Sequence, residues 1–218
     1  MTVRLLLGML AAVTCLMSPQ VQATNVQVKV MDHNGEPLEH AVISLMYSGT
    51  PEKATNISRR AIDQIDKEFV PHVLVVEKGT PVYFPNKDDI RHHVYSFSRP
   101  KKFELPLYKG TPAKPVVFDK AGVVKLGCNI HDWMLGYIYV VDTPYFAVTD
   151  ESGTAVVASL PAGNVTAVLW HPRMKGAPDA NAKKVVLTAT QTVSLNYQIK
   201  VKKEFRVRRA PRAGGRTY

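Results

Sequence analysis

Short apolar segments that alternate with polar residues recur along almost the whole chain, and turn signals separate them. Val26, Val28 and Val30, for example, alternate with polar residues and lead into a turn over residues 32–35. A period of two places every second side chain on the same face of a β-strand. Many short strands of this kind predict an all-β fold, either an antiparallel sandwich or a barrel. The strands expected on this basis cover residues 26–30, 41–47, 73–76, 81–84, 93–97, 116–118, 123–126, 136–141, 146–149, 155–159, 165–170, 184–188 and 193–199, and only residues 59–67 carry a possible helical turn.

The first 23 residues have the pattern of a secretory signal peptide. Arg4 supplies a short basic region, residues 5–17 are almost entirely apolar, and Ala23 ends a small-x-small cleavage site. The apolar run is shorter than the ~18 residues that a membrane-spanning helix needs, and no later stretch reaches that length. Cys15 lies in this segment, but Thr14 precedes it where a lipid-anchor signal needs Gly or Ala. We therefore expect cleavage near Ala23 and a periplasmic or secreted protein without a transmembrane segment.

Beyond this segment the sequence contains a single cysteine, Cys128. Exported proteins usually carry cysteines as disulfide pairs, and a lone thiol in an oxidising compartment is at risk of oxidation. A bound metal would protect it. The alternative is a buried, inert thiol that packs as a small apolar side chain.

Residues 127–136 bring three possible metal ligands into one loop between two expected strands, because Cys128, His131 and Met134 follow at intervals of three. With a second imidazole from elsewhere, they can form the trigonal site with a distant axial sulfur that suits copper in both oxidation states. Zinc is the alternative metal, but structural zinc sites use Cys and His, and Met134 is a poor zinc ligand. The candidates for the second imidazole are His33, His40, His72, His92, His93 and His171.

Two segments resemble the cupredoxin family of blue-copper proteins. Residues 84–94 (FPNKDDIRHHV) are similar to the strand–loop–strand that supplies the first histidine ligand, and residues 79–82 (GTPV) lead into it as in plastocyanin-like proteins. The C-x-x-H-x-x-M-x-G pattern of residues 128–136 looks like the short ligand loop of amicyanin. The resemblance covers residues 60–142 and is to periplasmic plastocyanin-like proteins often labelled methylamine-utilisation proteins.

This resemblance implies one copper ion, as Cu(I) or Cu(II), bound by His92, Cys128, His131 and Met134. His92 and His131 would be the equatorial imidazoles, Cys128 the thiolate and Met134 the axial sulfur. His93 stands where many relatives have an asparagine that braces the ligand loop. Because neighbouring strand residues point to opposite faces, only one of His92 and His93 can reach the metal. Asp88 and Asp89, a carboxylate pair in a turn, are expected to be solvated.

The strands on either side of the copper segment are expected to form further β-structure. Residues 148–153 and 160–164 resemble the transthyretin-like, carboxypeptidase-regulatory type of module. The expected fold class is therefore all-β, a cupredoxin Greek-key β-sandwich flanked by an additional small β-sandwich. Because ~55 residues is small for an independent domain, the N-terminal strands could belong to the C-terminal module. The expected divisions are a signal peptide (1–23), N-terminal strands (24–57), a cupredoxin copper domain (58–142), a C-terminal β module (143–200) and a basic disordered tail (201–218).

The net charge of +10 is concentrated at the C-terminus. Residues 200–218 carry +7, the segment before Thr24 carries +1, and about +2 remains for the rest. A tail of this composition predicts a solvated, disordered end, which could also dock to an acidic partner or an anionic membrane surface. Nucleic-acid binding is not expected, because the charges are not interleaved with stacking aromatic residues.

These features together predict an exported mononuclear type 1 copper protein that carries single electrons between a redox protein donor and a redox protein acceptor. Four protein ligands leave no open position for a substrate on the metal, so enzyme activity is not expected. One alternative is a copper-binding or delivery protein without redox turnover. The other is an interaction module in which the flanking sandwich has the main role.

Overall fold

The protein is built almost entirely of β-strands, as the computed structural model shows for residues 24–49, 60–189 and 191–203. The predicted signal peptide, most of the predicted basic tail and residues 50–59 lie outside these described residues. The all-β class predicted from the period-two segments is confirmed. The elements are β1 (Thr24–Asp32), β2 (Val42–Tyr47), β3 (Arg60–Ala61), β4 (Asp63–Ile65), β5 (Glu68–Val70), β6 (Val73–Glu77), β7 (Thr80–Tyr83), β8 (His92–Ser98), β9 (Lys101–Tyr108), β10 (Val116–Phe118), β11 (Gly122–Gly127), β12 (Leu135–Val141), β13 (Phe146–Val148), β14 (Thr154–Leu160), β15 (Gly163–Trp170), the 3-10 helix η1 (Pro178–Asn181), β16 (Lys183–Leu187) and β17 (Thr192–Ile199).

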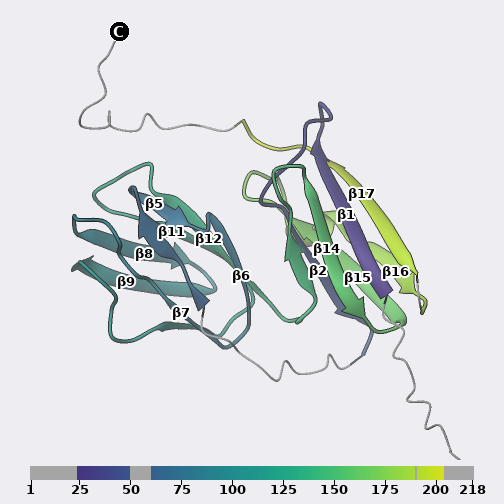
Figure 1. Cartoon of the computed structure of the whole chain (residues 1–218), viewed down its shortest axis with the longest axis horizontal. Helices are drawn as coiled ribbons and strands as arrows, with labels where there is room; N and C mark the ends of the chain where they lie inside the picture. The colour runs from purple at the N-terminus through teal and green to yellow at the C-terminus, as the bar shows by residue number, and fades with distance from the viewer. Residues whose placement is uncertain (1–23, 50–59, 190, 204–218) are drawn as a thin grey trace, which may run out of the picture.

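Residues 60–142 form one of the two lobes visible in Figure 1, which we call the central lobe. A five-stranded sheet, in the order β6-β12-β11-β8-β9, packs against a smaller sheet in the order β10-β7-β3. The alternating strands turn their apolar side chains into a shared core, whose largest fully buried members include Phe84, Phe118 and Leu126. Burial of these side chains is the main term that holds the two sheets together.

The second lobe, here the outer lobe, combines strands from both ends of the described chain. β1 lies between β14 and β17 in one sheet, and β2 lies between β13 and β15 in another. Both sheets contribute to one apolar core, in which Val28, Ile43 and Leu169 are fully buried. The N-terminal strands therefore complete the core of the C-terminal strands.

The two lobes meet at the outward face of β6 and β12. The side chains of Val75 and Tyr139 point away from the central sheet on this side, and they belong to the core of the outer lobe. The ring of Trp170 on β15 lies 5.7 Å from the ring of Tyr137 and 5.1 Å from that of Tyr139, measured between centroids. The outer lobe thus covers β6 and β12 and leaves the outward face of β8 and β9 open (Figure 1).

Two details of the strand pattern differ from the sequence-based expectation. The helical turn expected within residues 59–67 is wrong for its described part, because β3 and β4 occupy residues 60–61 and 63–65. Ile62 and Gln64 are fully buried there, which is the period of a strand. Strand β9 was not expected, because its residues at alternate positions are only half-buried and Pro106 interrupts them. Among the described residues, no helix is long and apolar enough to cross a membrane.

Candidate metal centre

Three side chains with metal-binding atoms converge at one end of the central sheet. His92 is the first residue of β8, Cys128 directly follows β11, and His131 lies in the loop that leads to β12. The ligand atoms of these residues all lie within 4.8 Å of one another. Within the described part of the chain, this is the one group of His, Cys, Asp and Glu side chains arranged closely enough to hold a metal ion.

Sheet pairing explains why residues far apart in the chain meet here. β8 and β11 are neighbouring antiparallel strands, with Gly127 opposite Tyr95, so the start of β8 lies beside the end of β11. β11 and β12 pair up to Gly127 and Leu135, which closes the intervening loop into a tight hairpin. Inside this loop the Met134 N–H donates to the His131 carbonyl at 2.9 Å. This hydrogen bond forms one turn over residues 131–134, and Cys128 lies at the other end of the same loop.

The distances between the three donors match a trigonal metal site. The Cys128 Sγ lies 3.8 Å from Nδ1 of His92 and 3.8 Å from Nδ1 of His131. Metal bonds of about 2.3 Å to sulfur and about 2.0 Å to nitrogen, at an angle of about 120°, separate the two donors by about 3.7 Å. The three side chains therefore fit one ion of copper size, and a thiolate with two imidazoles is the donor set that copper accepts in both oxidation states.

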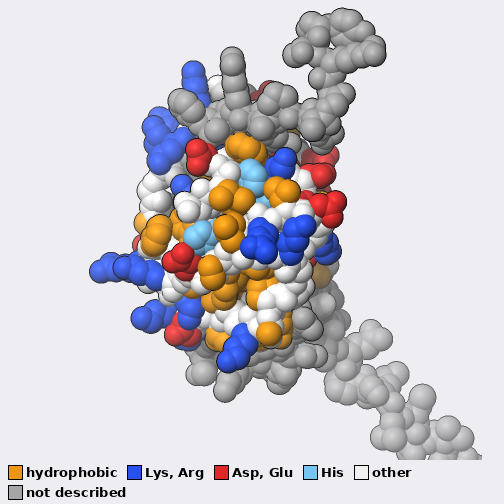
Figure 2. Space-filling view, turned by 90° about the vertical axis from the view of Figure 1, so that its left-hand side faces the viewer, with side chains coloured by type: hydrophobic (Ala, Val, Ile, Leu, Met, Phe, Trp, Pro, Cys, Tyr) orange, Lys and Arg blue, Asp and Glu red, His pale blue; other side chains and the backbone are white. Residues whose placement is uncertain are grey.

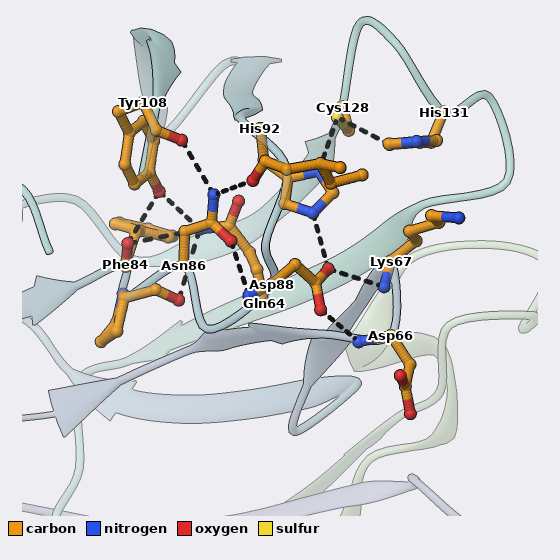
Figure 3. Close-up of polar contacts among 12 residues, drawn as sticks. Gln64, Asp66, Lys67, Phe84, Asn86, Asp88, His92, Tyr108, Cys128 and His131 are labelled. Atoms are coloured by element: carbon orange, nitrogen blue, oxygen red, sulfur yellow. Dashed lines mark hydrogen bonds and ion pairs between the residues drawn. The ribbon is translucent and has the colours of Figure 1, made fainter. Parts of the chain in front are cut away.

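A carboxylate on the far side of His92 sets which nitrogen faces the sulfur. Figure 3 shows the imidazole of His92 between Cys128 and Asp88. The Asp88 Oδ2 lies 2.7 Å from Nε2 of His92. An ionised carboxylate can only accept a hydrogen bond, so Nε2 carries the proton and the lone pair of Nδ1 points to the Cys128 sulfur. This is the outer partner that orients a metal-binding histidine in many metal sites.

Asp88 is itself held by the turn between β4 and β5. The backbone N–H groups of Asp66 and Lys67 donate to its two oxygens at 2.7 and 2.9 Å (Figure 3). Both turn residues adopt the left-handed conformation, with φ of 52° and 61°, which side chains other than glycine occupy at a cost. Burial alone would raise the pKa of Asp88, but the hydrogen bonds from His92 and from these two N–H groups outweigh it and lower that pKa. The carboxylate therefore stays ionised beside the imidazole.

Asn86 and Tyr108 fix the loop that carries Asp88 to His92. The amide of Asn86 donates to the carbonyls of Ile90 and Tyr108, both at 2.8 Å, and its oxygen accepts the Asp88 N–H at 3.0 Å. The Tyr108 hydroxyl donates to the Phe84 carbonyl at 2.7 Å. Burial is the main reason why the pKa of Tyr108 rises to about 12, so this hydroxyl remains a donor at neutral pH. These side-chain bonds act together with backbone bonds at the start of the loop, where the Asn86 N–H donates to the Gly110 carbonyl at 2.8 Å and the Lys87 N–H donates to the Gln64 carbonyl at 3.0 Å.

The centre is enclosed on the side of the protein core. His92 is fully buried, Cys128 is 3 % exposed and Met134 is 2 % exposed. Cys128 and Met134 belong to the same apolar cluster of the central lobe. Gly136 lets the chain pass close to Phe69 here, because a Cβ at this position would lie 2.8 Å from the Cβ of Phe69. Water therefore has access to the centre mainly from the loop side.

His131 is the member of the group that faces outward. It is half-buried, and its ring lies 5.0 Å from that of His92 and 5.1 Å from that of Trp133. Burial, followed by the influence of His92 and Lys67, lowers the pKa of His131. A lowered pKa favours the neutral imidazole, which is the form that binds a metal.

The remaining histidines do not join the centre. His93 points to the opposite face of β8, where its Nε2 lies 2.9 Å from a carboxylate oxygen of Glu104. His171 is buried in the outer lobe, with Nε2 3.1 Å from the Glu39 carbonyl and Nδ1 accepting the Arg173 N–H at 3.1 Å. Asp88 and Asp89 were both expected to be solvated. Asp89 is exposed, but the expectation for Asp88 was wrong, because its side chain is half-buried and bonds His92. The four-residue separation of Asp88 from His92 is the signal in the sequence that could have indicated their contact.

Comparisons with known proteins return matches among solved structures alone. No family model and no curated protein sequence matches the chain. The matching structures include a purple cupredoxin from Nitrosopumilus maritimus (24% identity, 38% of this chain, 99% of that chain, TM-score 0.33). They also include a reduced amicyanin variant (19% identity, 44% of this chain, 98% of that chain, TM-score 0.35). A copper-containing nitrite reductase from Thermus scotoductus SA-01 matches as well (25% identity, 44% of this chain, TM-score 0.37). This chain spans a quarter of the length of that reductase. The solved structures that it resembles are thus cupredoxins, and TM-scores this low do not establish function.

Proposed function

We propose that this protein is an exported carrier of single electrons, with one copper ion held by Nδ1 of His92, Sγ of Cys128, Nδ1 of His131 and the sulfur of Met134. The observation that carries the proposal is the convergence of three donor atoms within 4.8 Å at a buried end of the sheet. A copper ion bound by such donors changes between Cu(I) and Cu(II) by one electron. With four protein ligands there is no free position for a substrate, so we propose electron transport without catalysis.

The residues around the donors are suited to keep their geometry unchanged during electron transfer. Asp88 holds the ring of His92 through Nε2, and the turn at Asp66 and Lys67 holds Asp88. Cys128 and Met134 are packed into the apolar core, which limits their movement and excludes water. A centre that cannot rearrange, with solvent kept away, requires little reorganisation when its charge changes by one.

A partner would reach the centre through the end of the central lobe at which His131 lies. Figure 2 shows an end-on face of the molecule, where hydrophobic side chains gather around histidine side chains, with lysine and arginine side chains beside them. Ile90 and Ile130, which flank His92 and His131 in the chain, are 39% and 47% exposed. An apolar surface beside an outward-facing ligand is suited to brief contacts with redox proteins.

We propose that residues 24–57 and 143–200 form one small β-sandwich, into which the copper domain of residues 58–142 is inserted. The N-terminal pattern supports export to the periplasm or beyond the cell. The basic tail could attach the carrier to an acidic partner or an anionic membrane.

The test is a visible absorption spectrum of the purified protein after addition of Cu(II). We expect an intense blue band from thiolate-to-copper charge transfer, and a reversible one-electron wave in voltammetry. Cys128→Ser should abolish the band, because a hydroxyl does not replace the thiolate ligand. A blue band without reversible redox behaviour would favour copper delivery instead, and a colourless protein with weak copper binding would refute the copper centre itself.

A further inference from the structure

We propose that the end of the central lobe opposite the metal centre docks to the surface of a membrane that contains anionic phospholipids. This end, here called the basic end, is formed by Phe97, Arg99, Lys101, Lys102, Lys120 and Lys125. The proposal concerns residues of the folded lobe and not the C-terminal tail. It does not depend on the binding of copper.

The basic end lies at the far end of β8 and β11 from the candidate metal centre. β8 begins with His92 and ends with Ser98, whereas the antiparallel β11 begins at Gly122 and runs towards Cys128. At about 3.3 Å per residue, the length of β8 separates the two ends by about 20 Å. A membrane at the basic end therefore leaves the end at which His131 lies uncovered.

Two turns that touch each other build the basic end. Residues 99–100 connect β8 to β9, and residues 119–121 connect β10 to β11. A Cβ added to Gly122 would lie 2.8 Å from Cγ of Pro100, so the start of β11 packs against the β8–β9 turn. The side chains of the basic end are thus carried by short segments between paired strands, which hold them on one part of the surface.

Phe97 is the apolar part of the basic end. It is 78% exposed, the largest value among the exposed large hydrophobic residues of the described chain. Within residues 95–102 and 119–125 it is the one large apolar residue that is exposed. A stable docking face for a protein covers about 800 Å² on each partner and has an apolar core of several side chains. A single ring without a polar group is suited instead to enter the boundary between lipid headgroups and acyl chains.

Two lysines lie beside Phe97 in the sheet. Lys102 of β9 is its partner in the register with β8. Extending the β8–β11 register by two residues places Lys125 opposite Phe97 on the other side, and the Lys125 N–H donates to the hydroxyl of Ser98 at 2.8 Å. Residues that are directly opposite in neighbouring strands point to the same face of the sheet. The two ammonium groups can therefore reach lipid phosphates while the ring between them enters the membrane.

The charge of the basic end is positive and mostly unpaired. Its one neighbouring carboxylate in the two turns, Asp119, lies 3.3 Å from Lys101. Glu104, the carboxylate of β9, is 2.9 Å from His93. None of the ion pairs found among the described residues involves the other four cations, which are Arg99, Lys102, Lys120 and Lys125. Each lysine or arginine near an anionic membrane strengthens binding by about fivefold, so these four cations favour that partner.

The first test locates the docking surface with tryptophan. Phe97→Trp is compared with the matched control Val186→Trp, since Val186 is 67% exposed on β16 of the outer lobe. The vesicles contain equal parts of phosphatidylcholine and phosphatidylglycerol with brominated acyl chains, which quench an indole that enters the membrane. With the unchanged protein as the baseline for Trp133 and Trp170, we expect quenching in Phe97→Trp and none in Val186→Trp. Equal quenching in the two variants, or quenching in neither, would overturn the proposal.

The second test measures the binding of the full chain to the same vesicles without bromine, by sedimentation at low ionic strength. Lys102→Gln/Lys125→Gln should bind at least about tenfold more weakly, because two cations near the membrane are lost. The control Lys175→Gln/Lys184→Gln loses the same charge from exposed positions of the outer lobe, and should stay within about twofold of the unchanged protein. Equal weakening of the two variants would show that net charge alone drives binding, and would overturn the proposal.

A third measurement separates a membrane from an acidic protein as the partner. Poly-L-glutamate offers the carboxylates of an acidic protein without an apolar layer. The emission of Phe97→Trp should shift to the blue with the vesicles and stay unchanged with poly-L-glutamate. A shift with poly-L-glutamate and none with the vesicles would overturn the proposal in favour of an acidic protein. None of these measurements uses copper, so a negative result here leaves the electron-carrier function to its own test.

Discussion

Replacing Asp88 with asparagine removes one negative charge from beside the proposed copper centre with little change of shape. The carboxylate accepts from Nε2 of His92 at 2.7 Å and from the backbone N–H groups of Asp66 and Lys67. Asparagine can keep its oxygen towards His92 and Lys67, but its NH₂ group then faces the N–H of Asp66, and two donors meet. We therefore expect a change of the reduction potential together with a small loosening of the β4–β5 turn.

The size of the effect follows from the distance between the charge and the metal. The carboxylate lies one imidazole ring beyond the donor nitrogen, which places it roughly 6 Å from the ion; at an effective dielectric constant of about 20 the interaction is about 2.8 kcal/mol. The Asp88 side chain is 14% exposed, so screening by solvent and salt is incomplete. Allowing a loss of about half, the remaining 1.4–2.8 kcal/mol corresponds to roughly 60–120 mV for a one-electron couple. The negative charge stabilises Cu(II) over Cu(I), so its removal should raise the potential.

The assay is protein-film or solution voltammetry of the copper-loaded protein at constant ionic strength. Asp89→Asn is the matched control, because it removes the same charge one residue further along, from an exposed side chain. We expect the control to shift the potential by less than about 20 mV, as screening predicts for an exposed charge. A potential of Asp88→Asn that is equal to the control, or lower than that of the unchanged protein, would refute the assigned contact between Asp88 and His92.

Three further predictions concern the other parts of the molecule. His92→Ala should abolish the blue band whereas His93→Ala should leave it, because only His92 faces the Cys128 sulfur; visible spectra of both variants decide this. Burial lowers the pKa of His171 to about 4, so the folded protein binds fewer protons than the unfolded chain between about pH 6.5 and 4. The contribution of His171 to the free energy of unfolding should therefore fall by up to about 3 kcal/mol as the pH is lowered through this range, and urea titrations of His171→Gln should show a fall that is smaller by that amount. Gly136→Ala should lower the free energy of unfolding by about 1–3 kcal/mol, since the new Cβ would lie 2.8 Å from the Cβ of Phe69; unchanged stability in urea would contradict that contact.

Much of the fold could be predicted because local chemistry decides it. The alternation at Val26, Val28 and Val30 reappears as buried positions of β1. Strand β9 escaped prediction because it is the edge strand of its sheet, where alternate residues are only half-buried and the apolar period is weak. Residues 60–65 escaped because short segments of mixed polarity fit a helical turn and a strand equally well.

The sequence by itself predicted three of the candidate donors of the site. One short loop carries Cys128, His131 and Met134. These three residues stay near one another in any fold that places this loop between paired strands. The resemblance implied His92 rather than His93, and the tertiary structure supplies the physical reason, since the choice depends on which face of β8 looks into the central core. Only the tertiary structure brought Asp88 and the turn at Asp66 and Lys67 to His92, and laid the ring of Tyr95 over Gly127. These contacts join segments from different strands, and the burial of two sheet faces in a common core, not any local pattern, sets which segments meet.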